Sequence, residues 1–222
     1  MMTLYKTPVE EKKPDNELYL DKMHHILSAY TCIGVPPEPS NIIGNVFIGT
    51  SANAENNDLL KRKGFTHLLN CGAKQKFLAR NRRRGKQQHP GEEAGVKYYE
   101  ELYLDDSEEA DLRVHMSRAH GFIDQAQNHG GFILVYDSGV SRSGAIVISY
   151  LIKSGFPLLQ AVRMVKNKRR VALCNEGFMK QLVEYARHMD MLDPNLKSIR
   201  APKFGGPRDK YRLMTAHLPT FM

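Results

Sequence analysis

The stretch GGFILVYDSGVSRSGAIVISYLIKSG, residues 130–155, decides how this chain folds. Its first part, Gly130–Tyr136, is the most apolar run of the chain and predicts a buried strand. The small residues of DSGVSRSG predict a turn, and AIVISYLIKSG predicts an apolar helix that opens at Arg142–Ser143. Such a turn directs backbone N–H groups inward beside the positive end of the helix, which favours the binding of an anion.

Two residues of this turn strengthen the prediction of an anion site. Arg142 supplies a planar guanidinium that matches the oxygens of phosphate or carboxylate. Gly139 permits backbone torsions that other residues resist. The pattern GxSRSG is nevertheless a weak motif by itself, and an ordinary turn between a strand and a helix explains it equally well.

The rest of the chain alternates strands and helices. Further strands are predicted over 45–50, 65–72 and 96–104, and further helices over 17–29, 51–64, 111–128, 157–168 and 177–189. This alternation predicts an α/β fold with a central, mostly parallel sheet flanked by helices. We expect one domain over 17–190, a flexible N-terminal arm over 1–16, and a poorly ordered C-terminal extension over 191–222.

Composition narrows the class of protein. The chain has 222 residues, of which 41% are hydrophobic and 25% charged, as is usual for soluble globular proteins. It contains no run of ~20 apolar residues, so we expect no membrane span. Cys32, Cys71 and Cys174 are too far apart for a disulfide framework or a CxxC zinc site. We therefore expect no metal and no cofactor, and a reducing compartment, the cytoplasm or the nucleus.

The net charge of +8 favours anionic partners. Nucleic acid is an unlikely one, because the chain has no Trp and only 9% aromatic residues for base stacking. Basic residues concentrate over 80–86, within a predicted surface loop over 74–95. A solvated charge run is the commoner explanation of such a segment, and a partner site is the alternative. The oligomeric state does not follow from the sequence.

Several motifs resemble one known family. Val135–Ser143, VYDSGVSRS, resembles the H-C-x-x-G-x-x-R-S signature of cysteine-dependent protein phosphatases, and the dual-specificity class of small atypical type most of all. The resemblance extends over about residues 18–189, through IGNVFIG (43–49), GFTHLLN (64–70) and NEGF with Gln181-Leu182. It implies the cysteine-phosphatase fold. In that family a thiolate attacks phosphorus, loop N–H groups and an arginine hold the phosphate oxygens, and an aspartic acid protonates the leaving group.

The resemblance also assigns the site residues. It implies a phosphate-binding loop made of Asp137, Ser138, Gly139, Val140, Ser141, Arg142 and Ser143. The general acid would be Asp106 or its neighbour Asp105, and the register favours Asp106. Asn175 is expected to form hydrogen bonds with the backbone near this loop.

The signature is broken at its nucleophile. Tyr136 falls where the family has cysteine, and Val135 falls where it has histidine. A phenol with a pKa of about 10 is almost wholly protonated at neutral pH, and its oxygen lies farther from the backbone than a sulfur. Asp137 is the neighbouring carboxylate, but we expect its side chain to point away from the loop. Without a nucleophile the general acid Asp106 would be vestigial.

These residues predict a pseudophosphatase, which would bind phosphorylated proteins or scaffold protein kinases and phosphatases of a signalling pathway. Two arrangements remain open. Either Tyr136 rotates outward and Gly139–Arg142 hold phosphate, or Tyr136 plugs the pocket. The alternative functions are an active protein phosphatase with a non-standard nucleophile and a protein-binding scaffold that ignores phosphate.

Overall fold

The computed structural model describes residues 15–28, 34–72, 89–137 and 141–193. Outside the described residues lie most of the predicted N-terminal arm, the basic segment 80–86, Ser138, Gly139 and Val140 of the predicted loop, and the C-terminal extension from 194. None of the described helices has the length and apolar character that crossing a bilayer requires.

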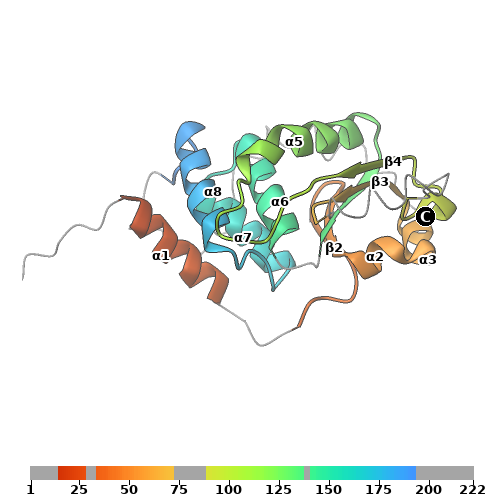
Figure 1. The fold of residues 1–222 in the computed structure, drawn as a ribbon, viewed down its shortest axis with the longest axis horizontal. Helices are drawn as coiled ribbons and strands as arrows, with labels where there is room; N and C mark the ends of the chain where they lie inside the picture. Colours follow the sequence, from red (N-terminus) through yellow and green to blue (C-terminus); the bar gives the residue numbers. More distant parts are fainter. Residues whose placement is uncertain (1–14, 29–33, 73–88, 138–140, 194–222) are drawn as a thin grey trace, which may run out of the picture.

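A five-stranded sheet forms the centre of the domain, in the order β1-β2-β5-β3-β4 (Figure 1). β1 is antiparallel to β2, and all other neighbouring strands are parallel. The strands are β1 (Ser40–Ile43), β2 (Val46–Thr50), β3 (Phe65–Asn70), β4 (Tyr98–Glu101) and β5 (Phe132–Asp137). The predicted α/β fold with a mostly parallel sheet is confirmed. The edge strand β1 was not predicted, because it is short and follows a proline-rich segment.

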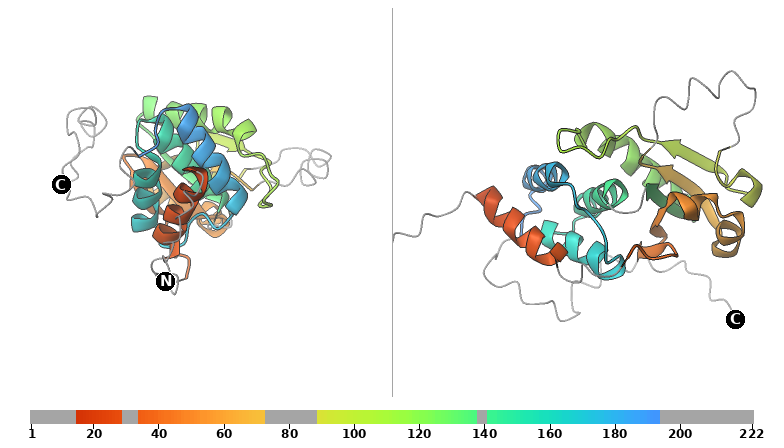
Figure 2. Two further views of the ribbon diagram at one scale, coloured as in Figure 1. Left: turned by 90° about the vertical axis from the view of Figure 1, so that its left-hand side faces the viewer. Right: turned by 60° about the horizontal axis from the view of Figure 1, so that its bottom comes forward.

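Helices cover both faces of this sheet (Figures 1 and 2). One face is covered by α5 (Arg113–Asn128) and α6 (Arg142–Lys153), with α7 (Leu158–Lys168) and α8 (Glu176–His188) packed beside α6. α1 (Asp15–Ser28) lies outermost on this side, against α7 and α8. The other face is covered by α2 (Ser51–Glu55) and α3 (Asn57–Lys63), with the short 3₁₀ helix η2 (Glu92–Ala94) against α3.

The two faces of β5 belong to two separate apolar cores. Successive side chains of a strand point to opposite faces. Ile133 and Val135 accordingly pack into the large core beneath α5 and α6, whereas Leu134 and Tyr136 pack into a smaller core with residues of α2, α3 and β3. This alternation fixes which side chains at the end of β5 can face the helix that follows.

Some element boundaries differ from those predicted. The predicted helix over 51–64 is two helices, because Asn56 adopts an extended conformation, with φ −88° and ψ 92°, and its side chain accepts a hydrogen bond from the backbone N–H of Leu59. α1 begins at Asp15, two residues before the predicted start. Lys166 ties α1 to α7 by donating a hydrogen bond of 2.5 Å to the carbonyl of Leu27.

Buried histidines make the stability of this fold dependent on pH. Burial lowers the pKa of His120 to about 4, and its Nε2 lies 2.8 Å from the hydroxyl of Ser149. The unfolded chain binds a proton at the ordinary pKa of 6.5, so it takes up more protons than the fold does between pH 6.5 and 4. The stability that neutral His120 provides is therefore lost as the pH falls through this range.

We predict that wild type loses about 2 kcal/mol of unfolding free energy relative to His120→Gln between pH 7 and pH 5. Urea denaturation at both pH values measures the difference. His188→Gln is the control, because it removes an imidazole from an exposed position. Parallel curves for wild type and His120→Gln would contradict the prediction.

Candidate functional site

The carboxyl ends of the parallel strands meet at one edge of the sheet, where ligands of open α/β sheets bind. Thr50 at the end of β2 pairs with Asp137 at the end of β5, and Tyr136 pairs with Asn70 at the end of β3. α6 begins at Arg142, after the segment 138–140 that lies outside the described residues. The predicted strand, loop and helix are therefore arranged around this edge.

Tyr136 faces away from α6. Its side chain is 3% exposed and packs in the smaller core, with its hydroxyl 3.5 Å from the hydroxyl of Tyr99 on β4. Burial, together with Tyr99, raises the pKa of Tyr136 far above its ordinary value. The phenol is thus neutral at physiological pH and lies on the opposite side of β5 from Asp137.

Asp137 faces α6, contrary to the expectation that its side chain points away from the loop. Its side chain is fully buried, and its carboxylate accepts hydrogen bonds from the backbone N–H of Ser143 at 3.1 Å and from the Ser143 hydroxyl at 2.9 Å. The reason is the strand alternation, which directs residue 137 to the face opposite residue 136. The carboxylate consequently lies at the N-terminus of α6, where a negative charge is stabilised.

Arg142 completes an ion pair with this carboxylate. Its Nε lies 3.6 Å from Oδ2 of Asp137, and one terminal nitrogen donates a hydrogen bond of 3.3 Å to the carbonyl of Leu104. The guanidinium lies directly over Gly72, where an added Cβ would come within 2.8 Å of it. Arg142 is therefore held over the ends of β3 and β5, with 16% of its side chain exposed.

A second network joins the predicted general acid to the loop. The side-chain amide of Asn175 donates to Oδ1 of Asp106 at 3.2 Å and to the carbonyl of Ser107 at 2.9 Å. The backbone N–H of Asn175 donates to the hydroxyl of Ser141 at 3.2 Å. Asn175 thus connects Asp106 with Ser141, as its predicted place near the loop requires. Asp105 and Asp106 are both exposed.

The segment that carries Asp106 is clamped onto α8. Gln181 accepts a hydrogen bond from the N–H of Leu112 and donates one to the carbonyl of Ala110, both at 2.8 Å. Gly177 lies so close that a Cβ built on it would come within 1.9 Å of the carbonyl oxygen of Glu108. The acidic segment is therefore a fixed wall of the site.

Cys71 lies beside this site, although it is far from the loop in sequence. It follows β3, its N–H donates to the carbonyl of Tyr136 at 2.8 Å, and it is fully buried. Burial and the charge of Asp137 raise the pKa of the Cys71 thiol well above its ordinary value, and Arg142 offsets this only in part. A buried neutral thiol of this kind is inert as a nucleophile.

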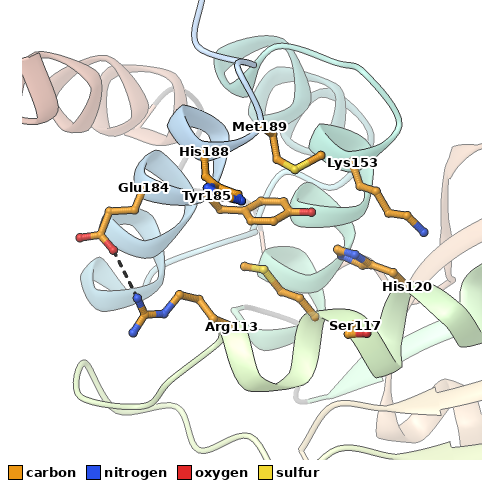
Figure 3. Close-up of a pocket in the computed structure, with 9 residues that line it drawn as sticks. Arg113, Ser117, His120, Lys153, Glu184, Tyr185, His188 and Met189 are labelled. Carbon is orange, nitrogen blue, oxygen red and sulfur yellow. Dashed lines mark ion pairs between the residues drawn. The ribbon is translucent and has the colours of Figure 1, made fainter.

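A cavity of about 660 Å³ lies elsewhere, between α5, α6 and α8 (Figure 3). Its wall includes Met116, His120, Lys153, Tyr185 and Met189, and Arg113 and Glu184 form an ion pair of 3.8 Å at its rim. None of the described residues predicted for the phosphate loop lines it. Within the described ranges, His, Cys, Asp and Glu form no cluster that could hold a metal ion.

Comparison with known families assigns the chain to a class of protein. The site lies at the carboxyl edge of a parallel sheet, where β5 ends at Asp137 and the following helix α6 begins at Arg142. A model of the dual specificity phosphatase catalytic domain matches residues 46–188. The chain therefore belongs to the dual-specificity phosphatase family, and the resemblance noted in the sequence is confirmed at this level.

Similar proteins support the same family. Dual specificity protein phosphatase 1 of Arabidopsis thaliana is 33% identical over 157 residues, which are 70% of this chain and 72% of the relative. Protein phosphatase Slingshot homolog 1 of Homo sapiens is 34% identical over 161 residues, but these are only 14% of its length. The chain thus corresponds to a small part of that larger protein.

Two solved human structures are similar in fold. The crystal structure of human DUSP28 has a TM-score of 0.59 and 30% identity, and the match covers 70% of this chain and 97% of that one. The crystal structure of human tyrosine phosphatase-like serine/threonine/tyrosine-interacting protein has a TM-score of 0.57 and 26% identity, and covers 69% and 98%.

The structure brings together most of the predicted site residues that it describes. Asp106, Asp137, Ser141, Arg142 and Ser143 lie around the N-terminus of α6, whereas Tyr136 lies on the other face of β5. Sequence reasoning missed the places of Cys71, Gly72 and the buried Arg169. For Cys71 and Gly72 the available signal was their place as the last two residues of the strand predicted over 65–72, since the ends of parallel strands meet at one edge of the sheet.

We predict that Gly177→Ala costs about 1–3 kcal/mol of unfolding free energy, because its methyl group collides with the backbone of the acidic segment. Limited proteolysis should then cut within 105–110 faster than in wild type. Gly121→Ala is the matched control. Residue 121 lies in α5 with open space around it, so alanine there should stabilise by up to about 1 kcal/mol. Equal stabilities of the two variants would contradict the proposed clamp.

Proposed function

We propose that this chain is a pseudophosphatase, a member of the dual-specificity phosphatase family that does not hydrolyse phosphate esters. It acts as a phosphoprotein-binding or scaffolding regulator in phosphorylation signalling, with phosphorylated proteins, kinases or phosphatases as partners. The observation that carries this proposal is the absence of a thiol at the end of β5, since the Cys71 thiol near Arg142 follows β3 and is buried, with a raised pKa. From the end of β5 it is a buried carboxylate that faces Arg142.

The tyrosine at the end of β5 does not replace the missing sulfur. The hydroxyl of Tyr136 is enclosed by the smaller core and lies near Tyr99, and its pKa is raised. A nucleophile needs its attacking atom close to phosphorus and in line with the leaving group. Attack by Tyr136 would require the ring to leave the core and cross to the other face of the sheet.

A binding role agrees with the parts of the site that remain. The other parts of the site are held by hydrogen bonds within the protein. Arg142 donates to the carbonyl of Leu104, and Asn175 donates to Ser141 and Asp106. The name of one structural relative describes it as phosphatase-like and as a serine/threonine/tyrosine-interacting protein. Its name supports the same kind of role here, namely interaction through a phosphatase fold.

The orientation of Asp137 favours one second candidate, an active phosphatase with a carboxylate nucleophile. In such a reaction an oxygen of Asp137 would attack phosphorus, the bond to the leaving oxygen would break, and Asp106 would supply its proton. Water would then hydrolyse the acyl phosphate and restore the carboxylate. Against this candidate, the carboxylate already accepts two hydrogen bonds from Ser143 and pairs with Arg142.

We predict that the purified wild-type protein releases no more phosphate from an aryl phosphate or a phosphotyrosyl peptide than buffer does. Phosphate release is measured against Asp137→Asn and Tyr136→Phe, purified in parallel. Equal background rates in all three support the pseudophosphatase, because a contaminating phosphatase would not follow these substitutions.

The contrary results identify which alternative holds. Turnover lost in Asp137→Asn but kept in Tyr136→Phe would establish the carboxylate nucleophile, and the reverse pattern would establish the phenol. Either result would refute the proposed function.

A further inference from the structure

The one described ion pair that connects the end of β5 with the start of α6 is that between Asp137 and Arg142. The carboxylate is fully buried and receives both the N–H and the hydroxyl of Ser143. Asp137 also acts on the fully buried Arg169, because its negative charge raises the pKa of Arg169 against the lowering effect of burial. A buried charge requires such partners to offset its loss of hydration.

The strand alternation changes how this segment corresponds to the phosphatase signature. In the signature, five residues separate the cysteine from the arginine, and this spacing assigns Tyr136 to the nucleophile position. A nucleophile must nevertheless point to the same side as the arginine. At the end of β5 that side belongs to Asp137, and only the four residues 138–141 separate it from Arg142.

We propose that Asp137, rather than Tyr136, occupies the nucleophile position, and that its carboxylate is an internal anion that fills the anion site of this loop. The loop is then one residue shorter than the signature, and Tyr136 corresponds to the histidine before the cysteine. This inference rests on the proposed function and narrows it to the scaffolding role, because it states how the site is kept from binding phosphate.

An internal carboxylate competes with any phosphate for the same donors. Arg142 and the N-terminus of α6 stabilise one negative charge well, but a phosphate dianion placed beside Asp137 would be repelled at short range. In the wild-type protein the site is consequently closed to phosphate. Removing the charge of Asp137 makes Arg142 available to an external anion.

Two single-cysteine probes test the assignment of the position. Asp137→Cys and Tyr136→Cys are each made in a background of Cys32→Ser, Cys71→Ala and Cys174→Ser, which leaves one thiol in each variant. The far-ultraviolet absorbance of the thiolate is followed during a pH titration. A thiol beside Arg142 and the start of α6 ionises well below its ordinary pKa of about 8.5, whereas a thiol in the apolar smaller core ionises above it.

The order of the two thiol pKa values decides the assignment. We expect the thiol of Asp137→Cys to have a lowered pKa and the thiol of Tyr136→Cys to have a raised pKa. The reverse order would overturn the assignment of Asp137 while leaving the proposed function intact. Phosphate release by the wild-type protein would instead refute the proposed function and would not change the order of the two pKa values.

Phosphate binding tests the internal anion. Inorganic phosphate is titrated into wild type, Asp137→Asn and the control Asp190→Asn, which adds the same charge at an exposed position where φ is 55° and asparagine is tolerated. Asp137→Asn should bind phosphate at least about tenfold more tightly than the other two. Adding Arg142→Ala to Asp137→Asn should abolish that gain.

Equal phosphate affinity of wild type and folded Asp137→Asn would overturn the internal anion, whether both bind or neither does. If Asp137→Asn does not fold, the proposal is judged on the thiolate titration of Asp137→Cys. An ordinary pKa for that thiol would show that the position offers no stabilisation to an anion, and would overturn the proposal by itself.

Discussion

The junction between β5 and α6 depends on one buried negative charge. Asp137 ends the most enclosed strand of the sheet, and its carboxylate is held by Ser143 and Arg142 at the first turn of the most buried helix. Loss of either partner would leave the buried charge only partly compensated, which destabilises the fold. The strand, the helix and the position of Arg142 over Gly72 are all fixed by this contact.

If the proposed function holds, the same contact accounts for the persistence of a phosphatase fold without catalysis. In a catalytic site the donors of the loop must be available to a substrate. Here Ser143 and Arg142 already hold the carboxylate of Asp137, so their interaction energy stabilises the folded protein. Asn175 and Gln181 fix the acidic segment that forms the wall of the site, because both donate hydrogen bonds to its backbone carbonyls.

Much of this arrangement could be predicted from the sequence. The apolar run before Asp137 predicted the strand, and the helical period of the residues after the turn predicted α6. The small residues between them predicted the turn. The alternation of strands and helices along the chain predicted the parallel sheet. Motif order placed Asp106, Asn175 and Arg142 at one site. These predictions succeeded because they rest on backbone geometry. The spacing of apolar residues follows from the helical and strand periods, and the carboxyl ends of parallel strands meet at one edge of the sheet.

The direction of the side chains at the end of β5 could not be predicted in the same way. Matching residues to a signature by spacing assumes a loop of constant length, and that assumption assigned Tyr136 to the site. The strand itself obeys a period of two, anchored by Leu134 in the smaller core and Val135 in the large one. That anchor becomes visible only when both cores are known. The break at Asn56 was missed for a similar reason, since an asparagine is compatible both with a helix and with its cap.

The most direct test of the account is the coupling free energy between Asp137 and Arg142 in a double-mutant cycle. Unfolding free energies are measured for wild type, Asp137→Asn, Arg142→Gln and the double variant, at low and at high salt. The account predicts a favourable coupling of about 1–3 kcal/mol that salt screens only weakly, because the pair is buried. A coupling near zero would show that the carboxylate does not need Arg142, and would contradict the claim that Asp137 is the anion of this site.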